Sequence, residues 1–217
     1  MRGQGESDDG DDRAAAEHGV LILMEIGERC WWVYDLDMAV TSDLMSVAEF
    51  SRLPEAAGGM RQELHHGELF ELAPVKKVHT FLQKRLVKLL ESASDAHVYG
   101  VDKEFPFRPE PEHQVWTADV AMFSIAEWNR TADDDYYHGV PTIVIEVLSP
   151  SNTASEMLSR ERICMRNGGR EFWLVDTDRE CVRVVRAGAE STDYDIDGVL
   201  RSPYFNAPIS VREIFAR

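Results

Sequence analysis

The stretch Thr142–Pro150, TIVIEVLSP, places one carboxylate inside a run that is otherwise apolar and β-branched. Such a run predicts a strand, in which alternate side chains point to opposite faces. Glu146 then shares its face with Val144 and Leu148, and the opposite face is apolar up to Ser149. Both faces are therefore typical of a strand buried on both sides. A lone ionised carboxylate is strongly disfavoured there. Either Glu146 meets a partner in a cleft, or the strand is less buried than its composition indicates.

A second stretch, Val115–Ser124 (VWTADVAMFS), repeats the anomaly with Asp119 in mid-strand. Alternation puts Asp119 on the same face as Ala121 and Phe123. Two sheet carboxylates on neighbouring strands would repel each other and raise a pKa, and a divalent cation would remove that repulsion. Mg²⁺ prefers one or two carboxylates, with water and phosphate oxygens as the other ligands. The alternative is that both acids occupy solvent-facing or edge positions, as most carboxylates do.

The rest of the chain predicts helices and strands around these two strands. The apolar periodicity, caps and breakers predict helices at Val47–Leu53, Val78–Ser92, Thr153–Asn167 and Val211–Phe215. The same signals predict a hairpin at Glu63–Leu72, a strand at Val98–Phe107, and a hairpin of Glu171–Asp176 with Cys181–Arg186. This order predicts an α/β or α+β fold, with helices flanking one mixed sheet.

The predicted helix after the opening strand offers a cation. Glu156, Arg160 and Cys164 are spaced i, i+4, i+8 and form one stripe of that helix. From there Arg160 could reach over the edge of the sheet toward Glu146. The alternative is an ordinary, solvated Glu156–Arg160 pair.

Composition is that of a globular domain with an acidic balance. The chain has 217 residues, 44% of them hydrophobic, and a formal net charge of -16. This charge argues against broad, sequence-independent binding to nucleic acid, although it leaves room for a local basic surface. The polar face of the second predicted helix is such a surface, or it is simply a solvated face; it carries Lys77, Lys84, Arg85 and Lys88.

The first 43 residues stand apart from the predicted domain. Residues 1–19 predict a disordered acidic tail without the basic start of a signal peptide. Residues 20–43 have no assigned role, and their apolar run Val20–Met24 is too short to span a membrane. Cys30, Cys164 and Cys181 form neither a disulfide framework nor a CxxC metal site, which favours a cytoplasmic location.

Several motifs in fixed order resemble the Uma-two family of restriction endonucleases, within the PD-(D/E)XK nuclease superfamily. These motifs are ELxxGEL from Glu63, a helix with an early histidine at His79, DVA from Asp119, IEVLSPS from Ile145, and GxxEFWLVD from Gly168. The resemblance covers residues 44–217 and is carried mainly by the last two motifs together.

The resemblance implies a restriction-endonuclease-like core that holds Mg²⁺ or Mn²⁺ and cleaves DNA. By position, Asp119 and Glu146 match the motif acids that bind the metal, and Glu63 matches an additional acid of the same cleft. Arg160 matches the residue that orients water and stabilises the phosphorane. A homodimer would suit cleavage of both strands.

The sequence departs from the family pattern at four positions near the proposed site. Ala118 replaces the usual proline, Glu156 replaces an aspartate, and Arg160 replaces a lysine, while Cys164 stands where an aromatic is usual. Arginine keeps the positive charge but does not deprotonate in a protein. The sequence therefore leaves two alternatives. One is an endonuclease, whose activity Arg160 either impairs or preserves. The other is a catalytically inactive protein with the nuclease fold that binds DNA or has a regulatory role.

Overall fold

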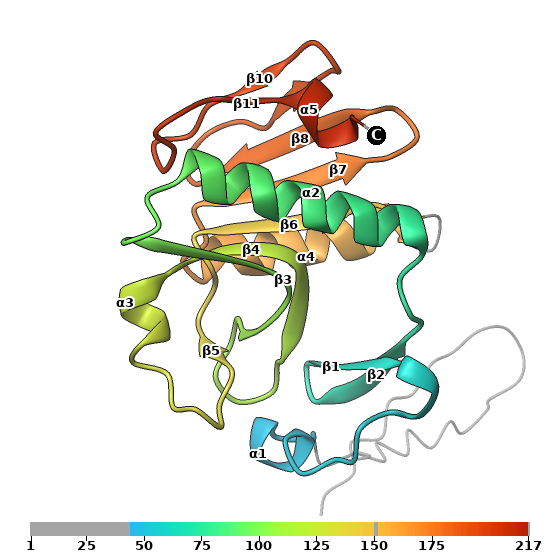
Figure 1. The fold of residues 1–217 in the computed structure, drawn as a ribbon. Coiled ribbons are helices and arrows are strands. Elements are labelled where there is room, and N and C mark those ends of the chain that lie inside the picture. The colour runs from blue at the N-terminus through green and yellow to red at the C-terminus, as the bar shows by residue number, and fades with distance from the viewer. Residues whose placement is uncertain (1–43, 150–151, 217) are drawn as a thin grey trace, which may run out of the picture. The chain divides into compact units, whose positions relative to one another are not determined.

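The computed structural model describes residues 44–149 and 152–216. The predicted acidic tail of residues 1–19 and the unassigned segment 20–43 lie outside the described residues, as does Pro150. Within residues 44–216 the main feature is a seven-stranded mixed sheet with the strand order β5-β3-β4-β6-β7-β8-β9 (Figure 1). The fold is α+β, as the sequence predicts.

Five strands of this sheet match predicted segments with small shifts at their ends, namely β3 (Tyr99–Arg108), β4 (Trp116–Ser124), β6 (Ile143–Val147), β7 (Glu171–Asp176) and β8 (Cys181–Arg186). The short strands β5 (Tyr137–His138) and β9 (Thr192–Tyr194) have no counterpart among the predicted segments. The β6–β7 and β3–β5 pairs are parallel, and the other neighbours are antiparallel. The two small sheets pair β1 (Arg61–His65) with β2 (Glu68–Leu72), and β10 (Val199–Leu200) with β11 (Ile209–Ser210).

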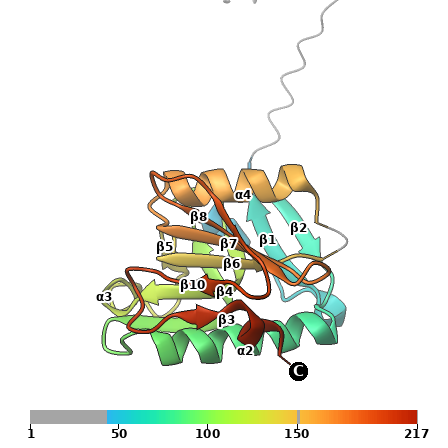
Figure 2. The ribbon, with the colours of Figure 1, turned by 90° about the horizontal axis from the view of Figure 1, so that it is seen from above.

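Two long helices cover opposite faces of the sheet (Figure 2). The helices are α1 (Val47–Phe50), α2 (Lys77–Ala93), α3 (Ile125–Trp128), α4 (Ala154–Arg166) and α5 (Val211–Phe215), with a 3₁₀ turn at Ala57–Gly59. The first helix ends three residues earlier than predicted, at Phe50. Leu82, Leu86 and Leu90 of α2 pack on one face of the sheet. Ile163 and Cys164 of α4 pack on the other face.

The side-chain alternation predicted for β6 is confirmed. Ile143, Ile145 and Val147 join the core on the α2 side, and Val144 joins the core on the α4 side. Glu146 follows Val144 toward α4, where it meets Arg160. The charge in this strand therefore faces a partner.

The alternation predicted for β4 is wrong at Asp119. Ala121 and Phe123 pack on the α4 side, as does Ala118, whereas Asp119 contacts residues of α2. The pairing of β4 with β6 runs from Met122↔Ile143 to Val120↔Ile145. The pairing of β4 with β3 also skips Asp119, opposite Glu104, which has a positive φ of 51°. At Asp119, β4 therefore no longer follows the regular pleat. The rule of alternation fails because it assumes a continuous ladder.

The sheet opens between β4 and β6 beyond Val120, and side chains satisfy the backbone groups there. The backbone N–H of Val147 donates to Oδ2 of Asp119 at 2.8 Å. The backbone N–H of Thr117 donates to Glu63, and its carbonyl accepts from Arg160. Buried backbone groups need such partners. The opening therefore gathers polar side chains at one place in the sheet.

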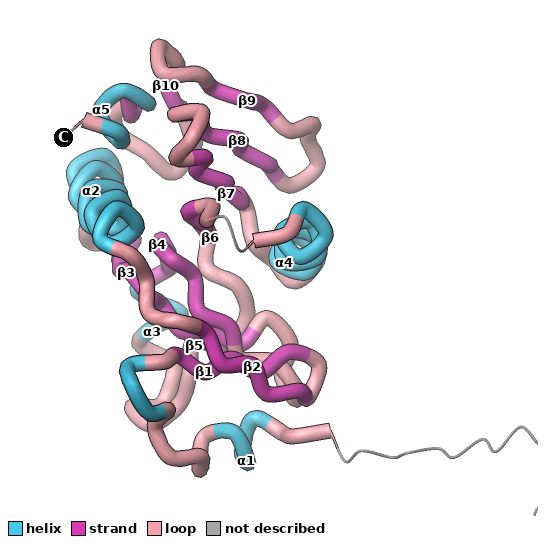
Figure 3. Tube along the Cα trace, turned by 90° about the vertical axis from the view of Figure 1, so that its right-hand side faces the viewer, coloured by secondary structure: helices cyan, strands magenta, loops and turns pink. Residues whose placement is uncertain are grey.

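The β1–β2 hairpin brings Glu63 to this opening. It lies beside the start of β4 (Figure 3), where Leu64 forms an antiparallel bridge with Val115, the residue before this strand. Gly67 is at the hairpin turn, as predicted, with φ of 80°. A Cβ there would lie 2.5 Å from Cβ of Leu44, so the close approach of Leu44 also requires glycine.

Candidate active site

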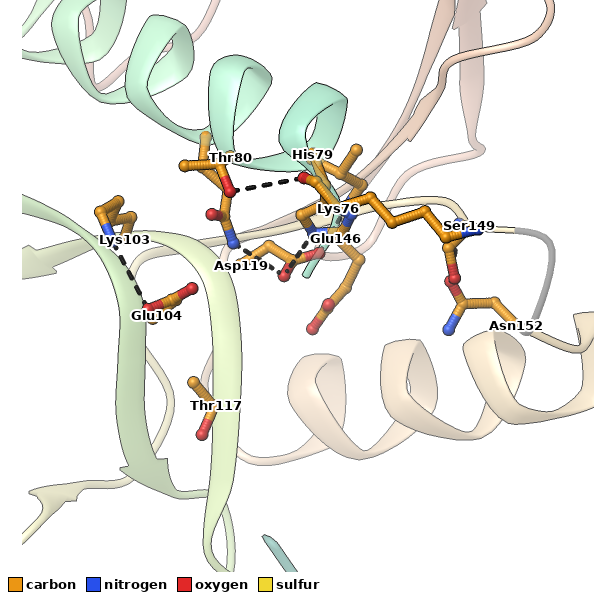
Figure 4. Close-up of polar contacts among 12 residues, drawn as sticks. Lys76, His79, Thr80, Lys103, Glu104, Thr117, Asp119, Glu146, Ser149 and Asn152 are labelled. Carbon is orange, nitrogen blue, oxygen red and sulfur yellow. Dashed lines mark hydrogen bonds and ion pairs between the residues drawn. The ribbon is translucent and has the colours of Figure 1, made fainter. Parts of the chain in front are cut away.

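One cavity of about 540 Å³ lies at the opening of the sheet and is lined by the predicted site residues. Glu63, Asp119, Glu146 and Arg160 all line it, and so does His79. Figure 4 shows Asp119, Glu146 and His79 close together between the two long helices. The acids come from β1, β4 and β6, and the two other residues come from α2 and α4. The convergence of Glu63, Asp119 and Glu146 on one pocket thus agrees with the sequence prediction.

Asp119 is held from two elements. Its Oδ1 lies 2.8 Å from Nε2 of His79 and accepts a hydrogen bond from Nε2 of Gln83 at 3.1 Å. Its Oδ2 accepts from the backbone of Val147. The carboxylate thus bridges α2 and the end of β6 and has a fixed orientation.

Arg160 is buried between two acids. Its Nη1 donates to Oε2 of Glu63 at 2.9 Å, and its Nη2 donates to Oε1 of Glu146 at 3.0 Å. Its guanidinium carbon lies 4.9 Å from the ring centroid of Trp116, a distance typical of a cation–π contact. Burial alone would lower the pKa of this guanidinium, but the two carboxylates raise it. Arg160 therefore stays charged.

Glu63 accepts hydrogen bonds through both carboxylate oxygens and is only 1% exposed. Oε1 accepts from the backbone of Thr117 at 2.9 Å, and Oε2 lies 2.7 Å from Nε2 of His65. Burial opposes ionisation, but Arg160 and His65 outweigh it and hold the pKa of Glu63 at about 2. Glu63 is thus an anion that orients Arg160.

Glu146 has the opposite electrostatic balance. Burial raises its pKa to about 8, and the neighbouring carboxylates Asp119 and Glu63 add to this effect. Arg160 counteracts the shift but does not cancel it. Within residues 44–149 and 152–216, Oε2 of Glu146 has no hydrogen-bond partner. A strongly raised carboxyl pKa in a cavity is typical of a functional site.

Arg160 of α4 reaches Glu146, as expected from the sequence, and does not pair with Glu156. Glu156 is exposed and closes a capping box with Thr153, whose hydroxyl accepts from the backbone of Glu156 at 3.1 Å. Arg160 instead turns inward, so the interpretation as a solvated pair is wrong. Cys164 is buried one turn further on, and burial raises the pKa of its thiol.

Several residues of this site were missed or underrated from the sequence. His79 lies in the site, with its Nε2 2.8 Å from Oδ1 of Asp119, and His65 lies beside the site, with its Nε2 2.7 Å from Oε2 of Glu63. Gln83 and Trp116 were not identified at all. A polar residue on the apolar face of α2 was the available signal for Gln83, which is fully buried.

The cavity does not contain a ready-made set of three metal ligands. Across the part of the chain that the structure describes, no group of three or more His, Cys, Asp or Glu side chains is arranged to hold a metal ion. Asp119 and Glu146 nevertheless share the cavity, and Glu146 has an oxygen without a protein donor. Mg²⁺ requires no more than one or two carboxylates, so these two residues fit it. None of the described helices is both long and apolar enough to cross a membrane.

A mixed sheet that opens between two central strands and holds acids and a cation at the opening defines a restriction-endonuclease-like fold. Residues 47–207 match the Uma2 family, described as "Putative restriction endonuclease". Because this match covers most of the sequence, the chain belongs to that family.

One solved structure with the same fold is described as a putative nuclease belonging to DUF820 from Anabaena variabilis ATCC 29413. The two share 20% sequence identity with a TM-score of 0.67, covering 79% of this chain and 98% of that one. No curated protein matches this sequence significantly.

Proposed function

We propose that this protein is a DNA endonuclease that hydrolyses phosphodiester bonds with the help of a divalent metal ion. The observation that supports this proposal best is the convergence of Asp119, Glu146 and Arg160, from β4, β6 and α4, on one cavity. The family to which the chain belongs supports the same reaction class. We propose that Asp119 and Glu146 are the acids of the PD-(D/E)XK pattern and that Arg160 takes the place of its lysine.

Asp119 and Glu146 would hold the ion, Mg²⁺ or Mn²⁺, with Glu63 as the third acid of the site. Mutual repulsion of the acids contributes to the raised pKa of Glu146, and a cation would relieve it. Glu63 is the weaker candidate for a ligand, because both of its oxygens already accept from the protein. When bound, the ion would activate water and neutralise charge on the phosphate.

The chain's own residues would orient the site and balance its charge. His79 and Gln83 fix the carboxylate of Asp119, and Arg160 fixes those of Glu63 and Glu146. Arg160 does not act as a base, because a guanidinium does not deprotonate in a protein. It contributes a permanent positive charge beside the position of the phosphate, where it would stabilise negative charge that develops in the transition state.

A second candidate function is a nuclease-fold protein that binds DNA without cleaving it. The contacts of Arg160 favour this alternative, since both terminal nitrogens already donate to Glu63, Glu146 and the carbonyl of Thr117. An arginine committed to these acceptors has less freedom to meet a phosphate. Arg160→Lys tests this point, because an ammonium is smaller and lacks the planar fork.

Supercoiled plasmid incubated with Mg²⁺ or Mn²⁺ separates the two functions. Nicking by the wild type that disappears in Asp119→Ala, purified identically, supports the endonuclease. Cleavage by Arg160→Lys but not by the wild type indicates a site impaired by arginine. If no variant cuts the plasmid while all retain DNA on a filter, the endonuclease is rejected in favour of the binding protein.

A further inference from the structure

The lysines of this chain are concentrated at one place. Four of its five lysines lie between positions 76 and 88, namely Lys76, Lys77, Lys84 and Lys88. No aspartate or glutamate falls within residues 76–88, although the whole chain has a formal net charge of -16. The start of α2 is therefore a local basic surface in an acidic protein.

The lysines at the start of α2 oppose the usual electrostatics of a helix. Lys76 is the N-cap and makes no side-chain capping hydrogen bond, and Lys77 is the first helical residue. The amino end of a helix carries a partial positive charge, so acids stabilise it and cations do not. Local helix stability thus gives no reason for these two lysines, whereas binding of an anion would.

The four lysines are exposed, and their ammonium groups have no partner among the described residues. None of them forms an ion pair with a carboxylate in residues 44–149 or 152–216, whereas Lys103 pairs with Glu104. Arg85 has a different role, because its Nε donates to the carbonyl of Glu213 at 2.7 Å and tethers α5 to α2. The charges of the four lysines are therefore available to an external ligand.

The positions on α2 form a line. Lys77, Phe81, Lys84 and Lys88 are spaced i, i+4, i+7 and i+11, on the side away from the buried leucines. They extend over roughly 16 Å at 1.5 Å per residue. Phe81 is 38% exposed between two of the lysines. An exposed aromatic among cations is typical of surfaces that follow a nucleic-acid strand.

The residue before this line, Lys76, lies in the wall of the cavity, whereas Lys77 and the rest of the line do not. Lys76 and Arg61 both belong to the cavity wall, together with Asp119 and Glu146. Arg61 forms no ion pair among the described residues, and its Nε and Nη1 are buried without a hydrogen-bond partner. Buried donors without partners require an explanation, and an anionic ligand at the cavity wall would supply one.

We propose that Arg61, Lys76, Lys77, Lys84 and Lys88 form a basic track that binds the phosphate backbone of DNA and leads the strand to the cavity. This inference rests on the proposed function, since it names the path of the same substrate. The lysines neutralise successive phosphates, and Phe81 packs against a sugar or base. The track explains how an acidic protein contacts DNA, because the contact is limited to this one basic surface.

The test is the salt dependence of DNA binding, measured by fluorescence anisotropy in EDTA so that no cleavage occurs. The probe is a labelled 20-base-pair duplex of random sequence. The variant is Lys84→Ala/Lys88→Ala, at exposed positions where alanine suits a helix. The matched control is Arg162→Ala/Arg166→Ala, which removes two exposed cations at the same spacing from α4. Circular dichroism verifies that both variants are folded.

Each phosphate contact contributes about 0.9 to the slope of log affinity against log salt. The track predicts that Lys84→Ala/Lys88→Ala lowers the magnitude of this slope by about 1.8, while the control keeps the wild-type slope. Equal slopes in both variants overturn the track. Binding to phosphatidylserine vesicles in preference to the duplex, if it depends on the same lysines, also overturns it.

A wild type that does not bind the duplex even at low salt also overturns the track. Hydrolysis of bis(p-nitrophenyl) phosphate with Mn²⁺, which needs no extended contact, then shows separately whether the proposed function survives.

Discussion

Arg160 connects the acids of the candidate site to one another. Its two terminal nitrogens bridge Glu63 and Glu146, residues that are 83 positions apart in the sequence but share one guanidinium. The buried charges of Arg160 and Glu63 are tolerated because each is the partner of the other. The same contacts hold the acids ready while limiting the freedom of the arginine. Stability and reactivity thus depend on one side chain.

Arg160→Ala is therefore expected to destabilise the protein strongly. Removal of one partner from a buried ion pair typically costs about 3–5 kcal/mol, because the remaining charge is left without compensation. Urea unfolding followed by tryptophan fluorescence measures the change. Arg162→Ala, in the same helix but exposed, should shift stability by less than about 0.5 kcal/mol. Similar stabilities of the two variants would show that the pairs of Arg160 contribute little.

The pKa shifts of Glu63 and Glu146 predict opposite effects of pH on stability. The pKa of Glu63 falls to about 2 on folding, so its contribution is present above pH 4.5 and is lost as the pH falls toward 2. The pKa of Glu146 rises to about 8, so the folded state is favoured below pH 4.5 and loses that advantage as the pH rises toward 8.

Urea titrations in EDTA between pH 3 and pH 9 can separate these contributions. Relative to the wild type, Glu146→Gln should flatten the decline of unfolding free energy between about pH 5 and pH 8. Glu63→Gln should reduce the loss below about pH 4.5. Because both variants retain every histidine, the differences isolate the two carboxyl groups. A Glu146→Gln curve parallel to that of the wild type from pH 5 to pH 8 would contradict the raised pKa.

At the scale of elements, the site exists because a ladder is interrupted. The strands β4 and β6 separate after Val120↔Ile145, and Asp119 takes over the hydrogen bond of Val147 that a neighbouring strand would otherwise accept. The β1–β2 hairpin adds Glu63 at the same place. The turn at Gly67 therefore affects the site indirectly, because it shapes the hairpin that carries Glu63.

Gly67→Ala is expected to destabilise the hairpin more than an ordinary turn substitution. Gly67 and Gly188 both have positive φ, at 80° and 74°, so alanine costs about 1 kcal/mol of backbone strain at each. Only at position 67 does the new Cβ also meet Leu44, at 2.5 Å. That clash should add about 1–3 kcal/mol. Thermal unfolding of both variants provides the comparison, and equal losses would show that Leu44 moves away freely.

The sequence predicts the regular elements well and the irregular ones poorly. Apolar alternation identified β6 and the direction of Glu146, because β6 has neighbours along its length. The same rule misplaced Asp119, where β4 leaves its partner. The spacing i, i+4 found Glu156 and Arg160 on one stripe but could not show which way each side chain turns. The direction in which Arg160 turns depends on contacts with distant residues such as Glu63, which lies 97 positions before it in the sequence.

For the whole molecule, the net charge of -16 sets the conditions under which DNA can approach. An acidic surface repels the phosphate backbone over about a Debye length, which is about 8 Å at physiological ionic strength. Productive binding therefore needs a basic region beside the acidic cavity, and a cation that reduces the charge of the cavity itself. The concentration of lysines in α2 meets the first need. A divalent ion would meet the second.

Mg²⁺ is accordingly expected to stabilise the folded protein through Asp119 and Glu146. A ligand that binds only the folded state adds about 2.7 kcal/mol at a concentration of 100 times its dissociation constant. The measurement is the midpoint of thermal unfolding against Mg²⁺ concentration, with NaCl added to keep ionic strength constant. General screening of an acidic surface acts on every variant alike, whereas a specific site requires its ligands. Asp119→Asn should therefore lose most of the Mg²⁺-dependent increase, and Glu171→Gln, which alters a buried acid paired with Arg186 away from the cavity, should keep it. An equal increase in both variants would mean that the ion stabilises the protein without occupying the site.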